Sequence, residues 1–455
     1  MIDFKKFSSY SKAGPRYTSY PTAPEFKESF NDDSYINELK NLDKSRDLSL
    51  YFHLPFCRSA CYFCGCNVVY TSKEDKKDRY IKYLKKELDL ISKYLDCSKN
   101  VTQLHFGGGT PTFFSPAQID EISIMIKSYF KNFDKNAEIS CEIDPRFFEK
   151  SHMEVLAKNG FNRISFGVQD FDLKVQEAIH RVQSFEETKH AIELARSFNI
   201  ESINIDLIYG LPYQSFESFC KTLDLTLSLD ADRLALFNYA HVPWMKKSMR
   251  KIDETTLPSA ETKLQILKYS IDFFTTHGYK MIGMDHFAKP NDELFLAIEK
   301  GELHRNFQGY TTKGGCDLIG IGLTSISQGE NFYAQNFKEM SEYEHSLDNN
   351  KLPIHRGIKL NSDDLIRHAV IMELMANFKL NIPHIEEKFN IKFSEYFKSE
   401  LAELKVFEDD NLLKISQNSI EVNETGSMLI RNIAMPFDSY LKKIPEDKRK
   451  FSKTV

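Results

Sequence analysis

LSLYFHLPFCRSACYFCGC, residues 48–66, decides how the rest of this chain is interpreted. The segment opens with a short apolar run, which predicts a buried strand. It closes with a loop that holds four cysteines in the spacing C-x-x-x-C-x-x-C-x-C, namely Cys57, Cys61, Cys64 and Cys66. The chain has eight cysteines, and the other four stand alone. Thiols crowded into one loop favour metal or redox chemistry over a disulfide framework.

The same pattern of an apolar run followed by polar residues recurs along the first half of the chain. The runs expected to form strands are residues 48–54, 101–106, 137–143, 162–168, 201–208 and 232–238. Between them, Ser115 with Gln118 and Ser184 with Glu187 predict capped helix starts. Alternation of this kind predicts a parallel sheet with right-handed crossovers, either doubly wound or curved into a barrel. The pattern alone does not separate these two folds.

Polar and glycine residues gather where the predicted strands end. Ligands of parallel α/β proteins bind at that edge of the sheet. Glu142 and Asp206 end apolar strands, which is costly for a carboxylate unless it faces solvent, a cation or hydroxyl donors. Asp206 fits either a ribose-binding residue or a satisfied strand-end cap. The GGGT motif at residues 107–110 fits either close approach to a ligand or a tight turn.

The spacing of the cysteines separates two kinds of metal site. A structural zinc site requires four ligands in a closed tetrahedron, usually supplied as two separated pairs. Here all four cysteines share one loop, and a single residue separates Cys64 from Cys66. An iron-sulfur cluster fits such tightly packed thiolates better. If only Cys57, Cys61 and Cys64 are ligands, one iron stays open for chemistry.

Composition and charge limit the function classes. The chain has 455 residues, of which 41% are apolar, enough for one large core and a smaller one. Its 60 basic and 65 acidic residues give a net charge of -5, which offers no overall basic field for nucleic acid. No apolar run is long enough for a signal peptide or a membrane span. We therefore expect an unexported, cytoplasmic enzyme that binds no nucleic acid, does not insert into membranes and acts as a monomer.

The chain changes character after residue 345. Amphipathic segments predict several helices, then a short β-hairpin at residues 412–426 and a final helix. This order resembles a winged helix, but without a basic excess it fits a lid or a substrate-side wall better than a DNA-binding module. The expected parts are an N-terminal segment covering the mouth of the main domain (1–45), the main α/β domain (46–345) and a helical C-terminal domain (346–455).

These residues carry a specific resemblance. A C-x-x-x-C-x-x-C loop directly after a first strand, with an aromatic residue before the third cysteine, here Phe63, is similar to the radical S-adenosylmethionine superfamily. Other motifs resemble one family within it, the oxygen-independent coproporphyrinogen III oxidases, also called coproporphyrinogen dehydrogenases. These motifs are YFHLPFC, CYFCGCN, LHFGGGTPTF, EIDPR, RISFGVQDF, NIDLIYGLP, FNYAH, GMDHFA, HRNFQGYTT and GPRYTSYPTA. The resemblance runs from about residue 14 to beyond residue 440.

The resemblance implies a fold and a reaction. The fold is a partial (β/α)6 TIM-like barrel with a smaller, mostly helical, winged-helix-like C-terminal domain. Cys57, Cys61 and Cys64 would hold a [4Fe-4S] cluster whose fourth iron binds S-adenosylmethionine, and Cys66 would lie nearby without being a ligand. Reduction by a flavodoxin- or ferredoxin-like donor would cleave the cofactor to methionine and a 5'-deoxyadenosyl radical. The radical would abstract hydrogen from a propionate of coproporphyrinogen III, and loss of CO2 and one electron would leave a vinyl group. Two such reactions would give protoporphyrinogen IX.

The resemblance also implies two molecules of S-adenosylmethionine. The residues that match the surroundings of the cluster-bound molecule are Tyr51, Gly108, Glu142 and Ile326. The residues that match the surroundings of the second are Phe63, Gly109, Thr110, Gln169, Arg181, Asp206 and Ala240. The substrate carries four propionates, and guanidinium groups grip carboxylates bidentately. Arg16 and Arg305 are therefore the candidate substrate residues.

Two other functions stay open from the sequence. A branch of the same family binds haem as a chaperone without decarboxylating anything. That branch generally lacks the C-x-C pair, the GPRYTSYPTA segment and the intact second-molecule set, all of which are present here. The other alternative is a non-enzymatic zinc or iron-sulfur structural protein, in which the polar strand ends would be idle. Ferredoxin-type electron transfer is disfavoured, because it needs a fully ligated cluster and no six-strand pocket.

Overall fold

The main domain is built on one large sheet whose middle strands are all parallel. The computed structural model describes residues 4–454. The parallel strands lie in the order β13 (Asp317–Ile321), β1 (Leu48–Leu54), β4 (Val101–Gly108), β5 (Phe133–Ile143), β6 (Arg163–Gln169), β7 (Ser202–Tyr209) and β8 (Arg233–Asn238). From β1 to β8 the spatial order follows the chain without a reversal, so the sheet is a partial barrel and not a doubly wound fold. The predicted fold class is confirmed.

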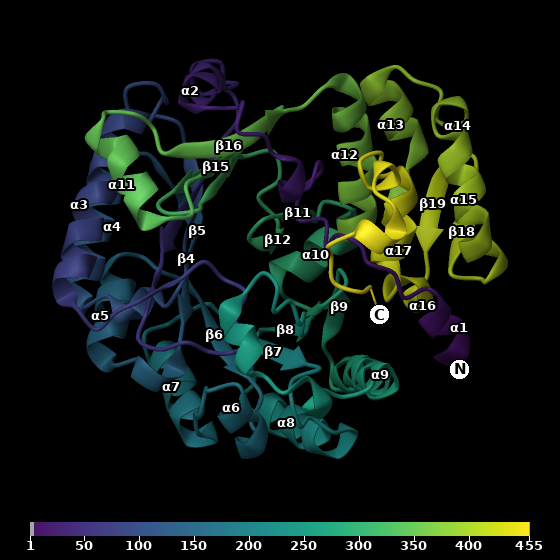
Figure 1. The fold of residues 1–455 in the computed structure, drawn as a ribbon, viewed down its shortest axis with the longest axis horizontal. Coiled ribbons are helices and arrows are strands. Elements are labelled where there is room, and N and C mark those ends of the chain that lie inside the picture. The colour runs from purple at the N-terminus through teal and green to yellow at the C-terminus, as the bar shows by residue number, and fades with distance from the viewer. Residues whose placement is uncertain (1–3, 455) are drawn as a thin grey trace.

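Helices cover the outer face of this sheet (Figure 1). They are α3 (Glu74–Ile91), α4 (Pro116–Tyr129), α5 (Lys150–Lys158), α6 (Leu173–Ala178), α7 (Phe185–Ser197) and α8 (Phe216–Ser228). Both predicted capping boxes are present, at Ser115 with Gln118 and at Ser184 with Glu187. In each box the two side chains satisfy backbone N–H groups that the first helical turn leaves without partners. Helices α4 and α7 therefore begin where the sequence predicts.

Antiparallel strands extend the sheet at both edges. They are β10 (His286–Ala288) and β9 (Lys280–Ile282) beyond β8, and β14 (Ile326–Gln328), β15 (Phe332–Asn336) and β16 (Ile354–Lys359) beyond β13. The other elements of this region are α9 (Ala260–Thr276), α10 (Glu293–Lys300), α11 (Met340–Asp348) and the hairpin of β11 (His304–Asn306) and β12 (Gly309–Thr311). Sequence pattern missed β13, which pairs with β1. Strand β1 is therefore hydrogen-bonded on both sides, by β13 and β4.

A second apolar core forms the C-terminal domain. Its elements are α12 (Ser362–Asn377), β17 (Lys379–Asn381), α13 (Ile382–Phe389), α14 (Phe393–Tyr396), α15 (Lys398–Asp409), β18 (Leu413–Ile415), β19 (Ser419–Val422), α16 (Glu424–Ser427) and α17 (Ile430–Ala434). The predicted helices and hairpin are present, and β17 adds a third strand to the hairpin. Within residues 4–454, no helix combines the length and the apolar content that crossing a bilayer requires.

The N-terminal segment runs between the two cores (Figure 1). Helix α1 (Phe4–Ser9) lies beside the C-terminal domain, and α2 (Asp32–Lys40) lies at the β15–β16 edge of the main sheet. Between them, the buried Tyr17 donates its hydroxyl to Asp438 at 3.0 Å. Arg431 of α17 donates to the carbonyl of Pro15, also at 3.0 Å. At the far end, the hydroxyls of Tyr35 and Ser327 are hydrogen-bonded at 2.9 Å. The segment thus contacts both cores.

Candidate active site

The cysteine loop projects from the carboxyl end of β1. Strands β2 (Phe56–Cys57) and β3 (Val69–Tyr70) pair in parallel and close its base. The ammonium group of Lys246 donates to the carbonyl of Cys66 at 2.9 Å. The backbone N–H of Tyr62 donates to the carbonyl of Ile179, also at 2.9 Å. All eight cysteines of the chain are free thiols, so backbone contacts and not disulfides hold the loop.

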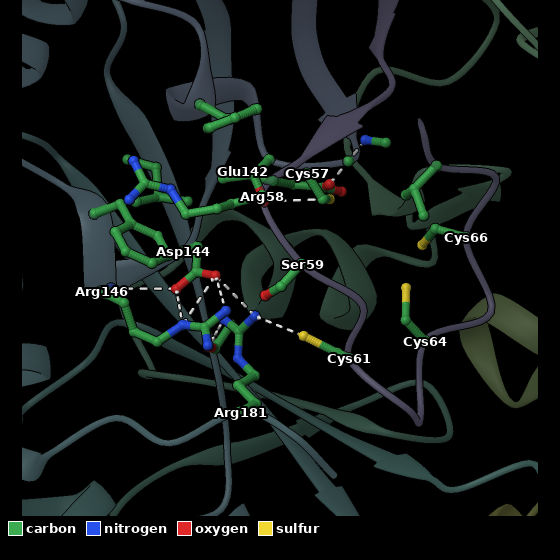
Figure 2. Close-up of a pocket in the computed structure, with 18 of the residues that line it drawn as sticks. Cys57, Arg58, Ser59, Cys61, Cys64, Cys66, Glu142, Asp144, Arg146 and Arg181 are labelled. Atoms are coloured by element: carbon green, nitrogen blue, oxygen red, sulfur yellow. Dashed lines mark hydrogen bonds and ion pairs between the residues drawn. The ribbon is translucent and has the colours of Figure 1, made fainter. Parts of the chain in front are cut away.

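Most of the predicted site residues line one cavity of about 230 Å³ at the carboxyl ends of the parallel strands. They are Cys57, Cys61, Phe63, Cys64, Cys66, Gly108, Gly109, Thr110, Glu142, Gln169, Arg181 and Asp206. Figure 2 shows Cys61, Cys64 and Cys66 along the loop, with Arg146 and Arg181 near Cys61. The fold therefore brings together side chains from the loop and from the ends of β4, β5, β6 and β7.

Glycine is required after β4 because the chain there passes close to the base of the cysteine loop. Gly108 has a φ of 110°, in a region that residues with a side chain rarely adopt. A Cβ on Gly109 would lie 2.6 Å from the backbone carbonyl carbon of Pro55. The next residue, Thr110, then has its hydroxyl oxygen 3.5 Å from the sulfur of Cys57. The glycines thus allow β4 to approach the loop closely and bring Thr110 next to a candidate ligand.

Arg181 is held by Asp144 and points at the cysteine loop. Its guanidinium group bonds the Asp144 carboxylate at 3.0 Å and the carbonyl of Gly167 at 2.6 Å, and it lies 3.7 Å from the sulfur of Cys61. Arg146 forms a second ion pair with Asp144 at 2.7 Å. Burial opposes the charge of Asp144, but the two guanidinium groups hold its pKa below the usual value. Arg181 thus brings a positive charge next to Cys61, a candidate cluster ligand.

Glu142 is positioned from the neighbouring strand ends. Its carboxylate accepts the backbone N–H of Gly108 at 3.1 Å and lies 3.3 Å from Nε2 of His105. Burial opposes the charge, but the His105 hydrogen bond and charge, with the Gly108 N–H, leave the pKa of Glu142 below its ordinary value. The ring of Tyr51 stacks on His105, with centroids 5.8 Å apart. Tyr51 itself lies outside the residues that line the cavity, and it supports Glu142 through His105.

Asp206 has a different electrostatic setting. Its carboxylate accepts hydrogen bonds from the Ser165 hydroxyl at 3.0 Å and from the Asn204 amide at 2.7 Å, and it has no ion pair among the described residues. Burial, followed by the negative charge of Glu142, raises the pKa of Asp206 to about 6. A carboxylate with two oxygens has further acceptor sites beyond these two bonds. Asp206 is therefore available to hydroxyl donors of a ligand.

Gln169 adopts a conformation that is uncommon for a residue with a side chain. Its φ is 71°, and the pairing of β6 with β7 shifts register between Gly167 and Gln169. A Cβ on Gly167 would lie 2.8 Å from Nε2 of Gln169, so glycine there leaves room for the amide. Left-handed backbone of this kind costs about 1–3 kcal/mol and clusters at ligand sites. The strain fits a side chain aimed into the cavity.

Two further predicted cofactor residues lie outside the residues that line this cavity. Ala240 follows β8, between Tyr239, which is buried, and His241. The side chain of His241 lies 3.0 Å from Glu254. Ile326 opens β14, and its side chain packs in an apolar cluster that includes Tyr333. Neither side chain reaches the wall that the twelve residues above form.

The two candidate substrate residues meet at a second place, around the buried Asp285. Arg16 forms an ion pair with Asp285, and Arg305 is 8% exposed with two guanidinium nitrogens that have no partner. Burial opposes the charge of Asp285, but His286, Arg16 and Arg305 hold its pKa well below the usual range. Arg431 is also buried, and burial together with the charge of Arg16 lowers its pKa to about 9. Only Arg16 is paired with Asp285, whereas Arg305 and Arg431 lie within its electrostatic influence, so this interior carries more positive than negative charge.

Unpaired polar atoms extend from Arg305 along the β11–β12 hairpin. Both amide atoms of Gln308 are buried without partners, and so is the hydroxyl of Tyr333. Buried polar groups are ordinarily hydrogen-bonded, so this interior suits a polar ligand. Gln308 was not predicted as a site residue, although it lies in the HRNFQGYTT motif. Asp144 was not predicted either, although the EIDPR motif places a carboxylate and an arginine together at a strand end.

Two family models match this chain. The Radical SAM superfamily model matches residues 51–226, and the HemN C-terminal domain model matches residues 360–429. The oxygen-independent coproporphyrinogen III oxidase of Helicobacter pylori (strain J99) is 57% identical over 457 residues, which cover 100% of this chain and 99% of that protein. This chain belongs to the oxygen-independent coproporphyrinogen III oxidase family. The protein of the same name from Escherichia coli (strain K12) is 44% identical over 97% of this chain and 96% of its own length.

A solved structure of the same family supports the fold. The structure reported as coproporphyrinogen III oxidase (HemN) from Escherichia coli, a radical SAM enzyme, superposes with a TM-score of 0.90. It is 44% identical, and the match covers 93% of this chain and 97% of that one. As a radical SAM protein, this member of the oxygen-independent coproporphyrinogen III oxidase family uses a [4Fe-4S] cluster and S-adenosylmethionine.

The residues of the cysteine loop fit such a cluster. Cys57, Cys61 and Cys64 are free thiols that line one cavity, and Arg181 lies against Cys61. Within residues 4–454, no three His, Cys, Asp or Glu side chains converge as the ligands of a single metal ion would. Thiols spread along a cavity wall suit a cluster of several atoms better than one ion.

Proposed function

We propose that this coproporphyrinogen III oxidase family member oxidatively decarboxylates two propionates of coproporphyrinogen III to vinyl groups, giving protoporphyrinogen IX. One observation carries the proposal: Cys57, Cys61 and Cys64 share a cavity with the carboxylates of Glu142 and Asp206. Radical chemistry of this kind needs thiolates for iron and polar groups for the cofactor in one place. The names of the relatives supply the substrate.

The residues nearest the cysteine loop would hold the cluster and the first cofactor molecule. Cys57, Cys61 and Cys64 would be the ligands, and the fourth iron would be left to S-adenosylmethionine. When bound, the cluster and its cofactor supply a one-electron cleavage that yields a radical able to abstract hydrogen from a propionate. Glu142 is ionised at neutral pH and is placed to accept a hydrogen bond from the amino group of that cofactor.

A second molecule of S-adenosylmethionine is assigned to the same cavity, next to Asp206 and Arg181. Asp206 can accept ribose hydroxyls, because it has no ion pair among the described residues and keeps free acceptor sites. The Nε–H of Arg181 is buried without a partner, which suits a carboxylate. Gln169, Phe63 and Thr110 line the same cavity.

The propionates of the substrate are assigned to the cationic interior around Asp285. Arg16 and Arg305 would bind two of them, and Gln308 would supply an amide donor. Arg431 would orient the N-terminal segment that carries Arg16, because it donates to the carbonyls of Gly14 and Pro15. Substrate carboxylates would compensate the positive charge that the protein alone leaves unbalanced.

The test is a product assay on the anaerobically reconstituted protein. Coproporphyrinogen III, S-adenosylmethionine and dithionite are added, and protoporphyrinogen and 5'-deoxyadenosine are measured together. We expect both products from the wild type and neither from Cys61→Ser. Haem binding without any decarboxylation would reject the proposal in favour of a haem-carrying role.

A further inference from the structure

An exposed apolar pair lies in a segment that contacts the cysteine loop. Trp244 is 59% exposed and Met245 is 65% exposed, in the segment that follows β8. Trp244 is the single tryptophan of the chain. Large neighbouring apolar side chains of this kind mark interaction sites, and tryptophan and methionine are enriched at them. We call Trp244, Met245, Lys247, Arg250 and Lys251 the Trp244 surface.

The Trp244 surface is strongly basic in a chain that is acidic overall. Residues 243–252, PWMKKSMRKI, hold four basic residues and no acidic residue, whereas the net charge of the chain is -5. Lys247, Arg250 and Lys251 are exposed, and across residues 4–454 none of them forms a salt bridge. Unpaired like charges around an apolar centre attract an acidic partner and align it on approach.

This surface is physically continuous with the loop that carries the cluster ligands. Lys246 donates to the carbonyl of Cys66 at 2.9 Å, and the ammonium group of Lys251 lies 4.9 Å from the centre of the Tyr62 ring. Behind the surface, the buried Met249 packs in an apolar cluster that also takes in Tyr62 and Phe63, the residues between Cys61 and Cys64. A protein seated on the Trp244 surface would therefore lie against the outside of the cysteine loop.

We propose that the Trp244 surface docks a small acidic electron-transfer protein of the flavodoxin or ferredoxin class, which reduces the cluster. The inference rests on the proposed function, because only a cluster-dependent reaction needs such a donor. One electron leaves the reduced flavin or iron-sulfur group of the partner, and the cluster held by Cys57, Cys61 and Cys64 accepts it. No covalent bond forms or breaks, and no proton is transferred. None of the residues of the Trp244 surface lines the cavity.

The test compares binding and turnover in matched variants of the holoenzyme. K247E/K251E reverses two charges of the Trp244 surface, and W244A removes its apolar centre. The control K131E/K135E makes the same charge change at two exposed lysines near the start of β5, which have no salt bridge within the described chain. Affinity for oxidised flavodoxin is measured by calorimetry at low and high salt. Turnover is measured with reduced flavodoxin and, separately, with dithionite.

We expect K247E/K251E to weaken flavodoxin binding at least tenfold and to remove most of its salt dependence, since two attractive charges become repulsive. W244A should weaken binding severalfold, and the control should match the wild type. With dithionite, all variants should turn over at the wild-type rate, because a small reductant needs no docking surface. Normal dithionite turnover also shows that the variants are folded and loaded.

Three results would overturn the proposal. The first is a flavodoxin affinity that is the same in K247E/K251E and W244A as in the wild type, or no measurable flavodoxin binding by the wild type. The second is a raised KM for coproporphyrinogen with dithionite, which would assign the surface to the substrate. The third is binding of anionic lipid vesicles without binding of flavodoxin, which would make it a membrane contact. Failure of the wild type to turn over with dithionite would instead count against the proposed function, and the binding result would still decide the docking.

Discussion

At the scale of residues, the four cysteines of one loop have different surroundings. Cys57 lies beside the Thr110 hydroxyl, and Cys61 lies beside the guanidinium group of Arg181. Cys66 is exposed, and it is held through its backbone carbonyl by Lys246. All four line the cavity, but Cys66 is the most exposed of them, so the four thiols are not equivalent as candidate ligands.

Replacement of single cysteines tests this difference. Cys61→Ser should abolish both the cluster and turnover, because an alcohol does not replace a thiolate ligand. Cys66→Ser should keep the iron content and the cluster absorbance of the wild type. The measurements are iron and sulfide per chain after anaerobic reconstitution. Loss of iron in Cys66→Ser would mean that the ligand assignment is wrong.

The raised pKa of Asp206 predicts a pH dependence of cofactor binding. Its pKa is about 6, and only the ionised form is a strong acceptor for ribose hydroxyls. At one pH unit below the pKa about a tenth of the groups are ionised, so affinity for the second molecule should rise roughly tenfold from pH 5 to pH 7. Equilibrium dialysis with labelled S-adenosylmethionine measures this. The Asp206→Asn variant should bind the second S-adenosylmethionine weakly, with an affinity that does not depend on pH. If the affinity of that variant still rose from pH 5 to pH 7 as in the wild type, Asp206 would not be the residue responsible.

At the scale of elements, one buried carboxylate ties helix α3 to the end of β13, to β15 and to α11. Glu87 of α3 accepts the backbone N–H of Gly322 at 2.8 Å, the amide of Asn336 at 2.7 Å and the hydroxyl of Tyr343 at 2.6 Å. All three donors are buried. The carboxylate therefore joins the first helix after the cysteine loop to the strand that closes the sheet beside β1.

Removal of this carboxylate should destabilise the main domain. Glu87→Ala leaves three buried donors without partners and opens a cavity, which predicts a loss of roughly 3–5 kcal/mol in the free energy of unfolding. Urea unfolding of the cluster-free protein, followed by circular dichroism, measures this loss. Glu121→Ala is the control, because Glu121 is exposed on α4, and it should change stability by less than about 0.5 kcal/mol. Equal stability of the two variants would contradict the structural role of Glu87.

At the scale of the whole molecule, the N-terminal segment joins the two cores around Asp285 and Arg431. Arg16 lies in this segment but pairs with Asp285, which follows β9 in the main domain. Arg431, from the C-terminal domain, binds the backbone of the same segment. The cationic interior is thus assembled from three parts that are far apart in the sequence.

Arg16→Ala should weaken substrate binding while cluster absorbance stays intact. The lost guanidinium contact predicts an increase in KM for coproporphyrinogen of about tenfold or more. Arg16→Lys should recover only part of it, because an ammonium group cannot bind a carboxylate bidentately. Lys12→Ala, which removes an exposed cation from the same segment, should leave KM unchanged. An unaltered KM in Arg16→Ala would exclude Arg16 from the substrate site.

Local sequence determined a large part of this protein. The six strands from β1 to β8 and the capped starts of α4 and α7 follow from periodicity and capping residues, because these act between near neighbours. The cysteine spacing and the strand-end motifs indicated the cluster, the glycines after β4 and the two carboxylates of the cavity, Glu142 and Asp206. The family resemblance added Phe63, Gln169 and Arg181. The family resemblance also added residues that lie outside the cavity, such as Tyr51, which stacks on His105. No motif could show that they lie there.

Tertiary structure alone decided what depends on contacts between distant segments. Strand β13 carries no strong pattern of its own, and it is a strand because β1 offers it an unpaired edge. Asp285 binds Arg16 across 269 positions of sequence, and Asp144 binds Arg181 across 37. Such pairs cannot be predicted from spacing along the chain, because they form only when folding brings distant segments together and buries their side chains. The run of basic residues at 243–252 is visible in the sequence. Only the fold shows that this segment contacts the cysteine loop.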